Sequence, residues 1–202
     1  MELRGKLIVF EGLDFTGKST QVRLLAERLR ARGLPVVTTR EPGGTPIGEE
    51  VRRILLSRKS SDLLPLSELL LLITCRAQVY SQVIAPALAR GAVVVSSRYR
   101  LSSLAYQGYG RGLDLELIRR LNDAATAGRR PDVTFLIDLP AELALARRKG
   151  KGDRIEGEDL EFYRRVRRGY LELTQDDPTV IRIDGKRSIE EIASIVFAHL
   201  GV

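Results

Sequence analysis

The chain has 202 residues, with 33 Lys and Arg against 26 Asp and Glu, and a formal net charge of +7. A chain of this length can bury a core without disulfides, and its positive charge suits either nucleic acid or a site that handles several phosphates. It has 5 Phe, 6 Tyr and no Trp, and basic residues do not alternate with aromatic ones as they do on surfaces that stack single-stranded bases. We therefore favour a phosphate-handling site over a nucleic-acid surface.

Cysteine usage and hydropathy indicate the compartment. Cys75 is the only cysteine, which excludes an internal disulfide and a zinc site built on cysteines. The first residues lead into a predicted strand without the apolar region and cleavage site of a signal peptide. The longest apolar run, Leu69–Ile73, is far shorter than the ~18 residues of a membrane span. We expect a cytoplasmic protein with neither a membrane nor a nucleic acid as partner.

Short apolar runs alternate along the chain with amphipathic helical stretches, which predicts βαβ units and a parallel sheet covered on both faces. Five strands are predicted, at Leu7–Phe10, Pro35–Thr39, Ala92–Ser96, Val133–Asp138 and Val180–Ile183. Seven helices are predicted, at Thr20–Arg32, Gly48–Leu56, Ser67–Ala89, Asp114–Ala125, Ala141–Arg148, Glu158–Leu173 and Ser188–His199. We expect a three-layer α/β fold with a five-stranded parallel sheet, and a single domain over residues 1–202.

The segment between the first strand and the first helix has the pattern of a phosphate-binding loop. Gly12 is followed by four residues and then by Gly17-Lys18-Ser19. The glycines let consecutive N–H groups face one point, and the N-terminus of the next helix adds a positive dipole end. Lys18 can reach the β- and γ-phosphates, and the Ser19 hydroxyl can ligate Mg²⁺. We predict a P-loop NTPase fold that binds a nucleoside triphosphate through Gly12, Leu13, Asp14, Phe15, Thr16, Gly17, Lys18, Ser19 and Thr20.

Three further loops carry glycine or cations. Glu41–Pro46 follows the second strand, where open α/β sheets place ligand contacts. Gly108–Gly112 reads as flexible and basic. Arg147–Arg154 holds five cations and two glycines, as expected of a lid (about residues 147–157) that closes over phosphates. A solvated charged loop is the alternative for this last segment.

Taken together, these segments resemble the thymidylate kinase family of nucleoside monophosphate kinases over almost the full length. The matching landmarks are Phe10–Asp14, Thr39–Thr45, Arg76–Gln78, Arg98–Tyr99, Ser102–Gly108 and Asp153–Glu156. The Arg-Glu-Pro-Gly-Gly-Thr and Ala-Tyr-Gln-Gly segments are far more particular to this family than a phosphate loop is. The resemblance implies transfer of the γ-phosphoryl group of ATP to dTMP, which gives ADP and dTDP with Mg²⁺. It also implies a homodimer.

The acceptor phosphate needs cationic partners. Arg40 and Arg98 each follow the C-terminal end of a strand, where bidentate hydrogen bonds could grip a phosphate. As bare sequence, either would be taken for a surface residue, and the resemblance favours the binding role. For Asp14 the resemblance implies a contact to the acceptor sugar hydroxyl and to a catalytic arginine. A loop-stabilising hydrogen bond of Asp14 stays open as the alternative.

The acceptor base is expected beside the third predicted helix. Leu72 and Arg76 lie four residues apart and share one face of that helix. In the family this face reads the thymine, with an arginine on a base carbonyl and an aromatic residue on the ring. Tyr106 and Gln107, with Ser102 in the same segment, resemble the positions that close on sugar and base.

The base-reading helix departs from the family pattern at two positions. Leu72 stands where the family usually has Phe, so it can cover a base but lacks the π face, which is worth ~0.5–1.5 kcal/mol. Cys75 replaces a polar residue before Arg76, with a small expected effect. An altered acceptor is therefore one alternative.

The catalytic charges depart from the pattern as well. Ser97 precedes Arg98 where the family usually has an Asp that organises the Mg²⁺ water shell. Either Asp14, Glu11 or Asp138 assists the metal, or turnover is impaired. A nucleotide-binding paralogue with weak activity is thus a second alternative.

The phosphate loop itself carries a further departure. Phe15 fills a loop position that holds an arginine in one family subgroup, so the transition-state cation is expected in the lid, as in the other subgroup. By the resemblance that position holds Lys149, with Arg147, Arg148 and Lys151 nearby. The predicted catalytic residues are Asp14, Lys18, Arg98, Arg148, Lys149 and Arg154. The predicted acceptor-binding residues are Arg40, Leu72, Arg76, Arg98, Ser102, Tyr106 and Gln107, and Ser19 is the predicted metal ligand.

Overall fold

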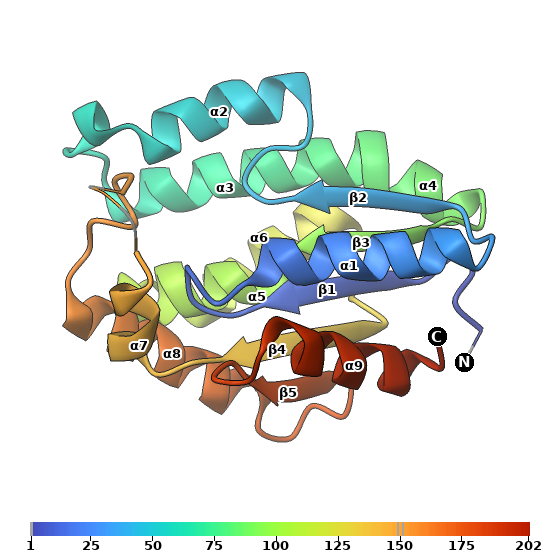
Figure 1. Ribbon diagram of the computed structural model, residues 1–202. Helices are drawn as coiled ribbons and strands as arrows, with labels where there is room; N and C mark the ends of the chain where they lie inside the picture. Colours follow the sequence, from blue (N-terminus) through green and yellow to red (C-terminus); the bar gives the residue numbers. More distant parts are fainter. Residues whose placement is uncertain (1, 149, 151) are drawn as a thin grey trace.

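A computed structural model describes residues 2–148, 150 and 152–202. Its five strands form one parallel sheet in the order β2-β3-β1-β4-β5, with β1 at Leu7–Glu11, β2 at Val36–Arg40, β3 at Val93–Ser97, β4 at Val133–Asp138 and β5 at Val180–Asp184. The predicted number of strands and their parallel arrangement are confirmed. In Figure 1 the arrowheads of β1, β2 and β4 point to the same edge, on the left, where the connecting loops gather.

The centre of the sheet is buried on both faces, as expected for parallel strands between helices. All five residues of β1 and of β3 are buried. Ile8 and Phe10 pack into the core cluster on one face, and Leu7 and Val9 into the cluster on the other. Successive side chains point to opposite faces, so this apolar run supplies both cores.

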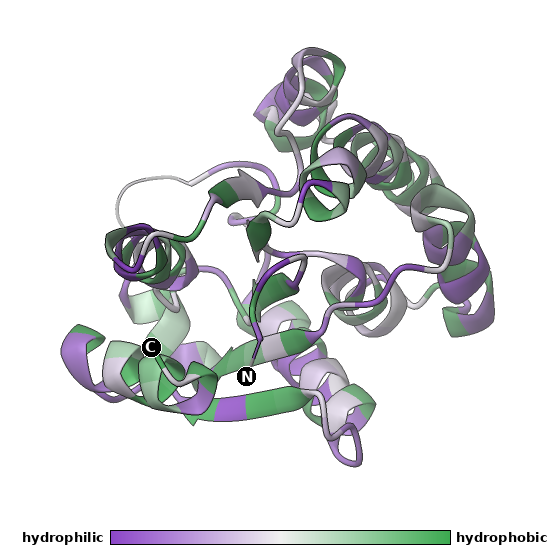
Figure 2. Cartoon of the chain, turned by 90° about the vertical axis from the view of Figure 1, so that its right-hand side faces the viewer, coloured by the Kyte–Doolittle hydropathy of each residue, from purple (hydrophilic) through white to green (hydrophobic). Residues whose placement is uncertain are grey.

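Helices cover both faces of the sheet. One face carries α1 and α9, and the other carries the helices between β2 and β3 and those that follow β3 and β4 (Figure 1). In Figure 2 the central strands are mostly green, and the surrounding helices alternate between green and purple turns. The α-helices are α1 Lys18–Ala31, α2 Pro46–Leu56, α3 Pro65–Val79, α4 Ala85–Ala89, α5 Arg100–Ser103, α6 Leu115–Thr126, α7 Ala141–Ala146, α8 Leu160–Thr174 and α9 Ile189–Leu200, and η1 is a short 3₁₀ turn at Arg58–Ser60.

Three helices, α1, α2 and α3, begin two residues earlier than the sequence predicts, and the first two starts have a clear local cause. Helix α1 begins at Lys18, because Gly17 adopts a left-handed conformation and lets the chain turn directly into the helix. Helix α2 begins at Pro46, where the Thr45 side chain accepts a hydrogen bond from the Gly48 N–H (3.0 Å). Both starts bring helix N-termini to the edge of the sheet where the loops gather.

The long predicted helix is continuous but changes its winding. A π-helical stretch, η2 at Tyr80–Ile84, joins α3 to α4, and the Ala85 N–H bonds to the Tyr80 carbonyl. Pro86 lacks an N–H donor, and a wider turn before it relieves the contact of its ring with the preceding turn.

The stretch Pro65–Ala89 is 25 residues long, and its most apolar 18-residue window has a mean hydropathy of 1.3 and is 28% buried. By length and composition alone it could cross a membrane, although its longest unbroken apolar run is Leu69–Ile73. Its two charged residues, Glu68 and Arg76, are 1% exposed and pair with other elements, as in a helix that packs within a protein.

Gly108–Gly110, the first part of the segment predicted to be a flexible glycine loop, is helical, so that part of the prediction was wrong. Residues Leu104–Gly110 form a second π-helical stretch, η3, that packs against α8. A side chain at Gly108 would lie 2.4 Å from the Leu115 side chain, and one at Gly110 would lie 2.7 Å from Phe162. These glycines therefore serve close packing rather than flexibility.

Candidate active site

A cavity of about 460 Å³ opens at the edge of the sheet where the strands end, a volume suited to small molecules. It is lined by the phosphate loop, the β2–α2 loop, α3, the end of β3, η3 and the segment after α7. The cavity is lined by all seven predicted acceptor residues: Arg40, Leu72, Arg76, Arg98, Ser102, Tyr106 and Gln107. From the phosphate loop it is lined by Asp14, Phe15, Gly17, Lys18, Ser19 and Thr20. Donor and acceptor residues thus share one cavity.

The phosphate loop has the backbone that anion binding needs. At Gly12 φ is +134°, and a side chain there would lie 2.5 Å from the Ile137 carbonyl oxygen. Gly17 caps α1 without a side-chain hydrogen bond, so the first N–H groups of the helix remain available to a phosphate. The Thr16 hydroxyl donates to the Leu13 carbonyl (3.0 Å) and closes the loop on itself. Gly12, Leu13 and Thr16 therefore shape the loop rather than line the cavity.

Phe15 holds a left-handed backbone, with φ at +64°. This conformation is strained for a residue with a bulky side chain, and such strain is often found at functional sites. Phe15 lines the cavity, and its uncharged ring supplies no cation to it.

Lys18 is folded back onto its own loop. Its Nζ donates to the Leu13 carbonyl and lies 3.5 Å from Thr16 Oγ1, and its side chain is buried. Burial, together with the nearby positive charge of Arg98, lowers the pKa of Lys18 to about 7. Between about pH 7 and 10.5 the Lys18 side chain is protonated in the unfolded chain but largely neutral in the folded one. Below this range, Lys18 therefore lowers the free energy of unfolding of the ligand-free protein. This destabilisation disappears as the pH rises through the range.

Nucleotide binding at pH 8 should accordingly take up close to one proton. Lys18 is mostly neutral at that pH in the ligand-free protein, and the phosphates of a nucleoside triphosphate favour its ammonium form. Titration calorimetry in two buffers of different ionisation enthalpy measures the uptake. Lys18→Arg, whose guanidinium stays charged, should bind nucleotide without it. Equal uptake by the two proteins would rule out Lys18 as the group that titrates.

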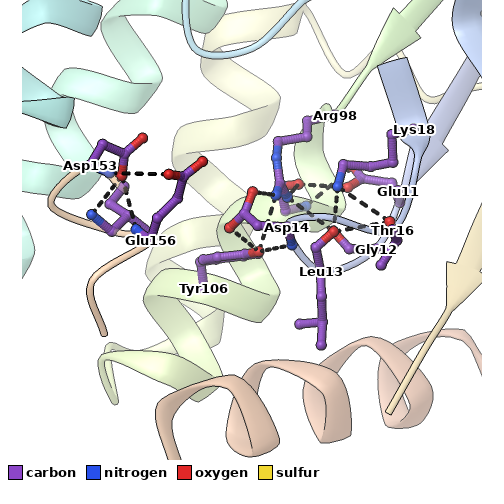
Figure 3. A network of polar contacts seen from close by, with 12 residues as sticks. Glu11, Gly12, Leu13, Asp14, Thr16, Lys18, Arg98, Tyr106, Asp153 and Glu156 are labelled. Atoms are coloured by element: carbon purple, nitrogen blue, oxygen red, sulfur yellow. Dashed lines mark hydrogen bonds and ion pairs between the residues drawn. The ribbon is translucent and has the colours of Figure 1, made fainter. Parts of the chain in front are cut away.

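Arg98 stands at the centre of a polar network that joins the phosphate loop to η3 (Figure 3). Its Nη2 donates to Asp14 Oδ1 (2.5 Å) and to the Tyr106 hydroxyl (3.0 Å), and the Tyr106 hydroxyl donates to Asp14 Oδ2 (2.9 Å). Burial acts to raise the pKa of Asp14, but the charges of Arg98 and Lys18 outweigh it and hold the pKa below its ordinary value. Asp14 is therefore an ionised partner of Arg98, and both line the cavity.

A buried carboxylate, Glu11, lies behind this network. The sequence analysis considered it only as an aid to the metal and did not predict that it positions other side chains. Glu11 accepts hydrogen bonds from the Tyr99 N–H (2.9 Å), from the Ser102 side chain (2.5 Å) and from the Tyr170 hydroxyl (3.1 Å). Ser102 and Tyr170 in turn accept from Arg98 Nη1. Burial raises the pKa of Glu11. Only its place at the end of a buried strand could have indicated this role.

Arg76 is fully engaged within the protein. Its Nε and Nη2 donate to Glu41 Oε2, and Nη2 also donates to the Tyr99 carbonyl (2.9 Å). Its Nη1 donates to Ser103 Oγ (2.7 Å) and to Asn122. Arg76 lines the cavity, yet a base carbonyl would have to share these donors rather than find a free one.

Arg40 and Arg52 both line the cavity near the β2–α2 loop. Arg40 Nη2 donates to both carboxylate oxygens of Glu49 (2.9 and 3.0 Å) and is half exposed. Arg52 on α2, which the sequence analysis did not single out, lines the same cavity and donates to the Pro42 carbonyl (2.8 Å). The amphipathic pattern of α2 placed Arg52 on a helix but could not show which side of the cavity it reaches.

The cations of the lid segment differ in position: one lines the cavity, and two bind to backbone carbonyls away from it. Arg147 lines the cavity and donates to the Gly185 carbonyl (3.1 Å), whereas Arg148 donates to the Glu156 carbonyl (2.6 Å) and does not line it. Arg154 donates to the Leu55 carbonyl (2.9 Å) and also lies away from the cavity lining. Lys149 and Lys151 lie outside the described residues.

Two acidic residues of the lid also line the cavity. Asp153 Oδ1 accepts from the Ile155 and Glu156 N–H groups (2.9 and 2.8 Å), and Glu156 Oε2 accepts from the Asp153 N–H (3.0 Å). Figure 3 shows this pair apart from the Arg98 network. The Asp-Arg-Ile-Glu motif marked these residues, although it did not reveal the reciprocal turn that they form.

The residues present fit a magnesium ion held mainly by a nucleotide. Ser19 is exposed at the start of α1 and lines the cavity. Within residues 2–148, 150 and 152–202 no cluster of three His, Cys, Asp or Glu could hold a metal by itself. Mg²⁺ usually keeps several waters and takes one or two protein ligands besides phosphates, which suits such a site.

Ser97 stands where the family usually has Asp, and three other carboxylates were considered as substitutes for it. They differ in whether they can reach a metal ion in the cavity. Asp138 is bound by Arg167 and Arg182, and Glu11 is buried behind Arg98. Neither lines the cavity, whereas Asp14 does. Asp14 is thus the accessible carboxylate of the three.

Comparison with known proteins decides the family. A family model described as thymidylate kinase matches residues 10–196. The chain belongs to the thymidylate kinase family. The thymidylate kinase of Caldanaerobacter subterraneus subsp. tengcongensis is 47% identical over 196 residues, which cover 96% of this chain and 94% of that protein. The thymidylate kinase of Pelotomaculum thermopropionicum is 50% identical over 190 residues, which cover 92% of this chain and 88% of that protein.

A solved structure supports the same assignment. The crystal structure of thymidylate kinase from Ehrlichia chaffeensis matches with a TM-score of 0.81 and 37% identity, and the match covers 98% of each chain. The predicted α/β fold is therefore confirmed. The thymidylate kinase family consists of ATP-dependent nucleoside monophosphate kinases, so the predicted class of enzyme is confirmed as well.

Proposed function

We propose that this protein transfers the γ-phosphoryl group of ATP to dTMP, with Mg²⁺, and so forms ADP and dTDP. The observation that carries the proposal is that the phosphate loop and the predicted acceptor residues line one cavity. Family membership and relatives at 47–50% identity over nearly the whole chain support the same reaction.

The residues divide the work by charge. Lys18 and the N–H groups at the start of α1 bind the donor phosphates, and Ser19 would offer an oxygen to Mg²⁺, which would supply positive charge against the phosphates. Arg98 and Arg40 hold the acceptor phosphate, and Asp14 keeps the Arg98 fork in place. These contacts bring the two nucleotides into line, which is most of what phosphoryl transfer asks of a protein.

The lid supplies the remaining cation. Phe15 offers no charge, so we propose that the segment 147–157 closes over the phosphates and excludes water. Arg147, which lines the cavity, joins Arg148, Lys149 and Arg154 as a candidate for the transition-state contact. The whole chain then works as a single kinase domain.

The direct test is turnover of the purified protein with ATP and Mg²⁺. ADP release would be measured with dTMP, dUMP, UMP, CMP and AMP in turn. The proposal expects the highest kcat/KM with dTMP. A preference for another monophosphate would favour the altered acceptor suggested by Leu72, and tight binding without turnover would favour the weak paralogue suggested by Ser97. The comparisons give no support to either alternative.

Ser97→Asp should raise kcat about threefold to tenfold. Ser97 is 8% exposed and lines the cavity, so a carboxylate there would meet the metal-bound water with a charge-assisted hydrogen bond of ~1 kcal/mol. The rate would be measured across a range of Mg²⁺ concentrations. Ser97→Asn, of similar shape without charge, is the control. An unchanged or lower rate for Ser97→Asp would show that Asp14 and the phosphates already hold the metal.

We also propose a cytoplasmic homodimer that acts on small molecules, without nucleic acid or membrane. Leu64, Leu66 and Leu70, at the start of α3, are between 46% and 67% exposed, which leaves an apolar face for a second copy. Sedimentation equilibrium should give twice the chain mass of 22.5 kDa. A single-chain mass at micromolar concentration would contradict the dimer.

A further inference from the structure

Glu68 is a buried carboxylate that the proposed chemistry leaves without a role. It lies on α3, one helical turn before Leu72 and two before Arg76, and its side chain is 1% exposed. Arg111 Nη2 (3.2 Å) and Arg154 Nη1 (2.8 Å) pair with its Oε2. Two cations from different segments therefore meet one carboxylate behind the expected base site.

The other oxygen of Glu68 holds the amide of Gln107. Gln107 Nε2 donates to Glu68 Oε1 at 2.7 Å, across 39 residues of sequence. Gln107 Oε1 is buried and has no partner among the described residues. Gln107 lines the cavity with Leu72 and Arg76. The NH₂ group of Gln107 thus donates to Glu68, while its carbonyl oxygen is still able to accept a hydrogen bond.

The charge of Glu68 fixes which way this amide faces. An ionised carboxylate only accepts hydrogen bonds, so rotating the amide by half a turn would bring Gln107 Oε1 against Glu68 Oε1. Such a contact loses a charge-assisted bond and sets two acceptors against each other. Burial acts to raise the pKa of Glu68, but Arg111, the Gln107 hydrogen bond and Arg154 outweigh it and keep the pKa below its ordinary value.

We propose that Glu68 is a positioning residue that selects the acceptor base by holding Gln107 with its Oε1 free to accept a hydrogen bond in the cavity. This inference rests on the proposed function and goes beyond it. Thymine and uracil carry an N3–H donor on the pairing edge, whereas cytosine carries an acceptor at N3. A fixed acceptor accordingly favours the first two bases and rejects cytosine.

The same carboxylate connects base selection to the lid. Arg154 lies in the lid segment, and its N–H donates to the Leu56 carbonyl (3.1 Å) at the end of α2. Arg111 also pairs with Glu158 just before α8. The two arginines that keep Glu68 ionised are thus anchored at the end of α2 and just before α8, so the amide is oriented while Arg154 stays docked at α2.

The test is Glu68→Gln, a change of nearly the same shape. Arg111 and Arg154 should hold the new amide by its oxygen, so that its NH₂ faces Gln107 and donates to Oε1. Gln107 would then turn its own NH₂ toward the base. We expect the ratio of kcat/KM for dTMP over dCMP to fall tenfold or more, mostly through a higher KM for dTMP. If Glu68 were merely structural, the variant would have a lower kcat/KM for dTMP and dCMP by the same factor. An unchanged ratio of the two values would overturn the inference.

The exchanged pair Glu68→Gln with Gln107→Glu is the rescue. The amide at position 68 donates to the carboxylate at position 107, whose other oxygen is again an acceptor for the base. We expect this double variant to regain most of the lost dTMP preference, and no regain counts against the inference.

A measurement on the wild-type protein avoids any effect of the variants on folding. Here 3-deaza-dTMP, which lacks the N3–H, should bind about tenfold more weakly than dTMP. Equal binding overturns the inference while leaving the proposed function intact. The proposed function fails separately, if the wild-type protein does not turn over dTMP.

Discussion

Replacing Arg98 with methionine should lower kcat/KM for dTMP phosphorylation by roughly 10³-fold. Arg98 lies at the end of β3 with a left-handed backbone (φ +71°), and its guanidinium spans Asp14, the Gly12 carbonyl (3.2 Å) and Ser102. One arginine is thus preorganised between the phosphate loop and the acceptor side. Loss of one such preorganised donor costs about 10²–10³ in rate, and loss of the charge adds to it.

The effect should lie mainly in kcat, with a smaller rise in the KM for dTMP, as measured by steady-state kinetics. Arg98→Lys keeps the charge but not the fork, so it should fall between the wild type and Arg98→Met. Arg100→Met is the matched control. Arg100 lies two residues further on and bonds to Thr126 (2.8 Å) and Asp123, away from the cavity. A control that loses as much activity as Arg98→Met would show that the loss comes from misfolding rather than from the site.

Replacing Arg76 with methionine should lower the free energy of unfolding by about 3–5 kcal/mol. The change leaves the Glu41 carboxylate buried without its charge partner, since both side chains are at most 3% exposed. For a chain of this size, the loss corresponds to a melting temperature lower by roughly 6–20 °C. Thermal and urea unfolding measure it.

The pH dependence identifies the cause of this loss. Burial raises the pKa of Glu41, and Arg76 is the charge that opposes the rise. Without Arg76 the pKa should rise further, so the variant's stability should be better preserved near pH 5 and be lost as pH rises toward 8. Adding Glu41→Gln removes the buried charge and should recover part of the stability. A loss independent of pH, or no recovery in the double variant, would point to the Ser103 and Asn122 contacts instead.

The sheet and the phosphate loop could be predicted because their determinants are local. The apolar run Leu7–Phe10 is long enough for a strand buried on both faces, and Gly12 and Gly17 allow positive φ where the loop needs it. The observed ends of several helices and strands differ from the predicted ends by a few residues, because caps such as Thr45 act through single hydrogen bonds. The glycines of η3 were misread because a glycine that permits close packing and one that permits motion look alike in sequence.

The candidate site was predicted by motif more than by geometry. The landmark segments contain every predicted acceptor residue except Leu72, yet they could not show that the donors of Arg76 are already taken. Nor could they show that Arg154 turns toward Glu68 while Arg147 faces the cavity. The orientation of a long side chain depends on neighbours from other segments, and a motif does not contain them.

The sequence by itself determined the parallel sheet and a phosphate loop that starts a helix, because these follow from apolar periodicity and residue spacing within short segments. It indicated the family through the resemblance of its landmark motifs. Only the tertiary structure decided which charges meet. Glu41 and Arg76 are 35 residues apart, and Glu68 and Gln107 are 39 apart. Their contacts exist because packing brings α3, the β2–α2 loop and η3 around one cavity. Burial there makes each unpaired polar atom costly, so the partners that satisfy one another also fix what the site can bind.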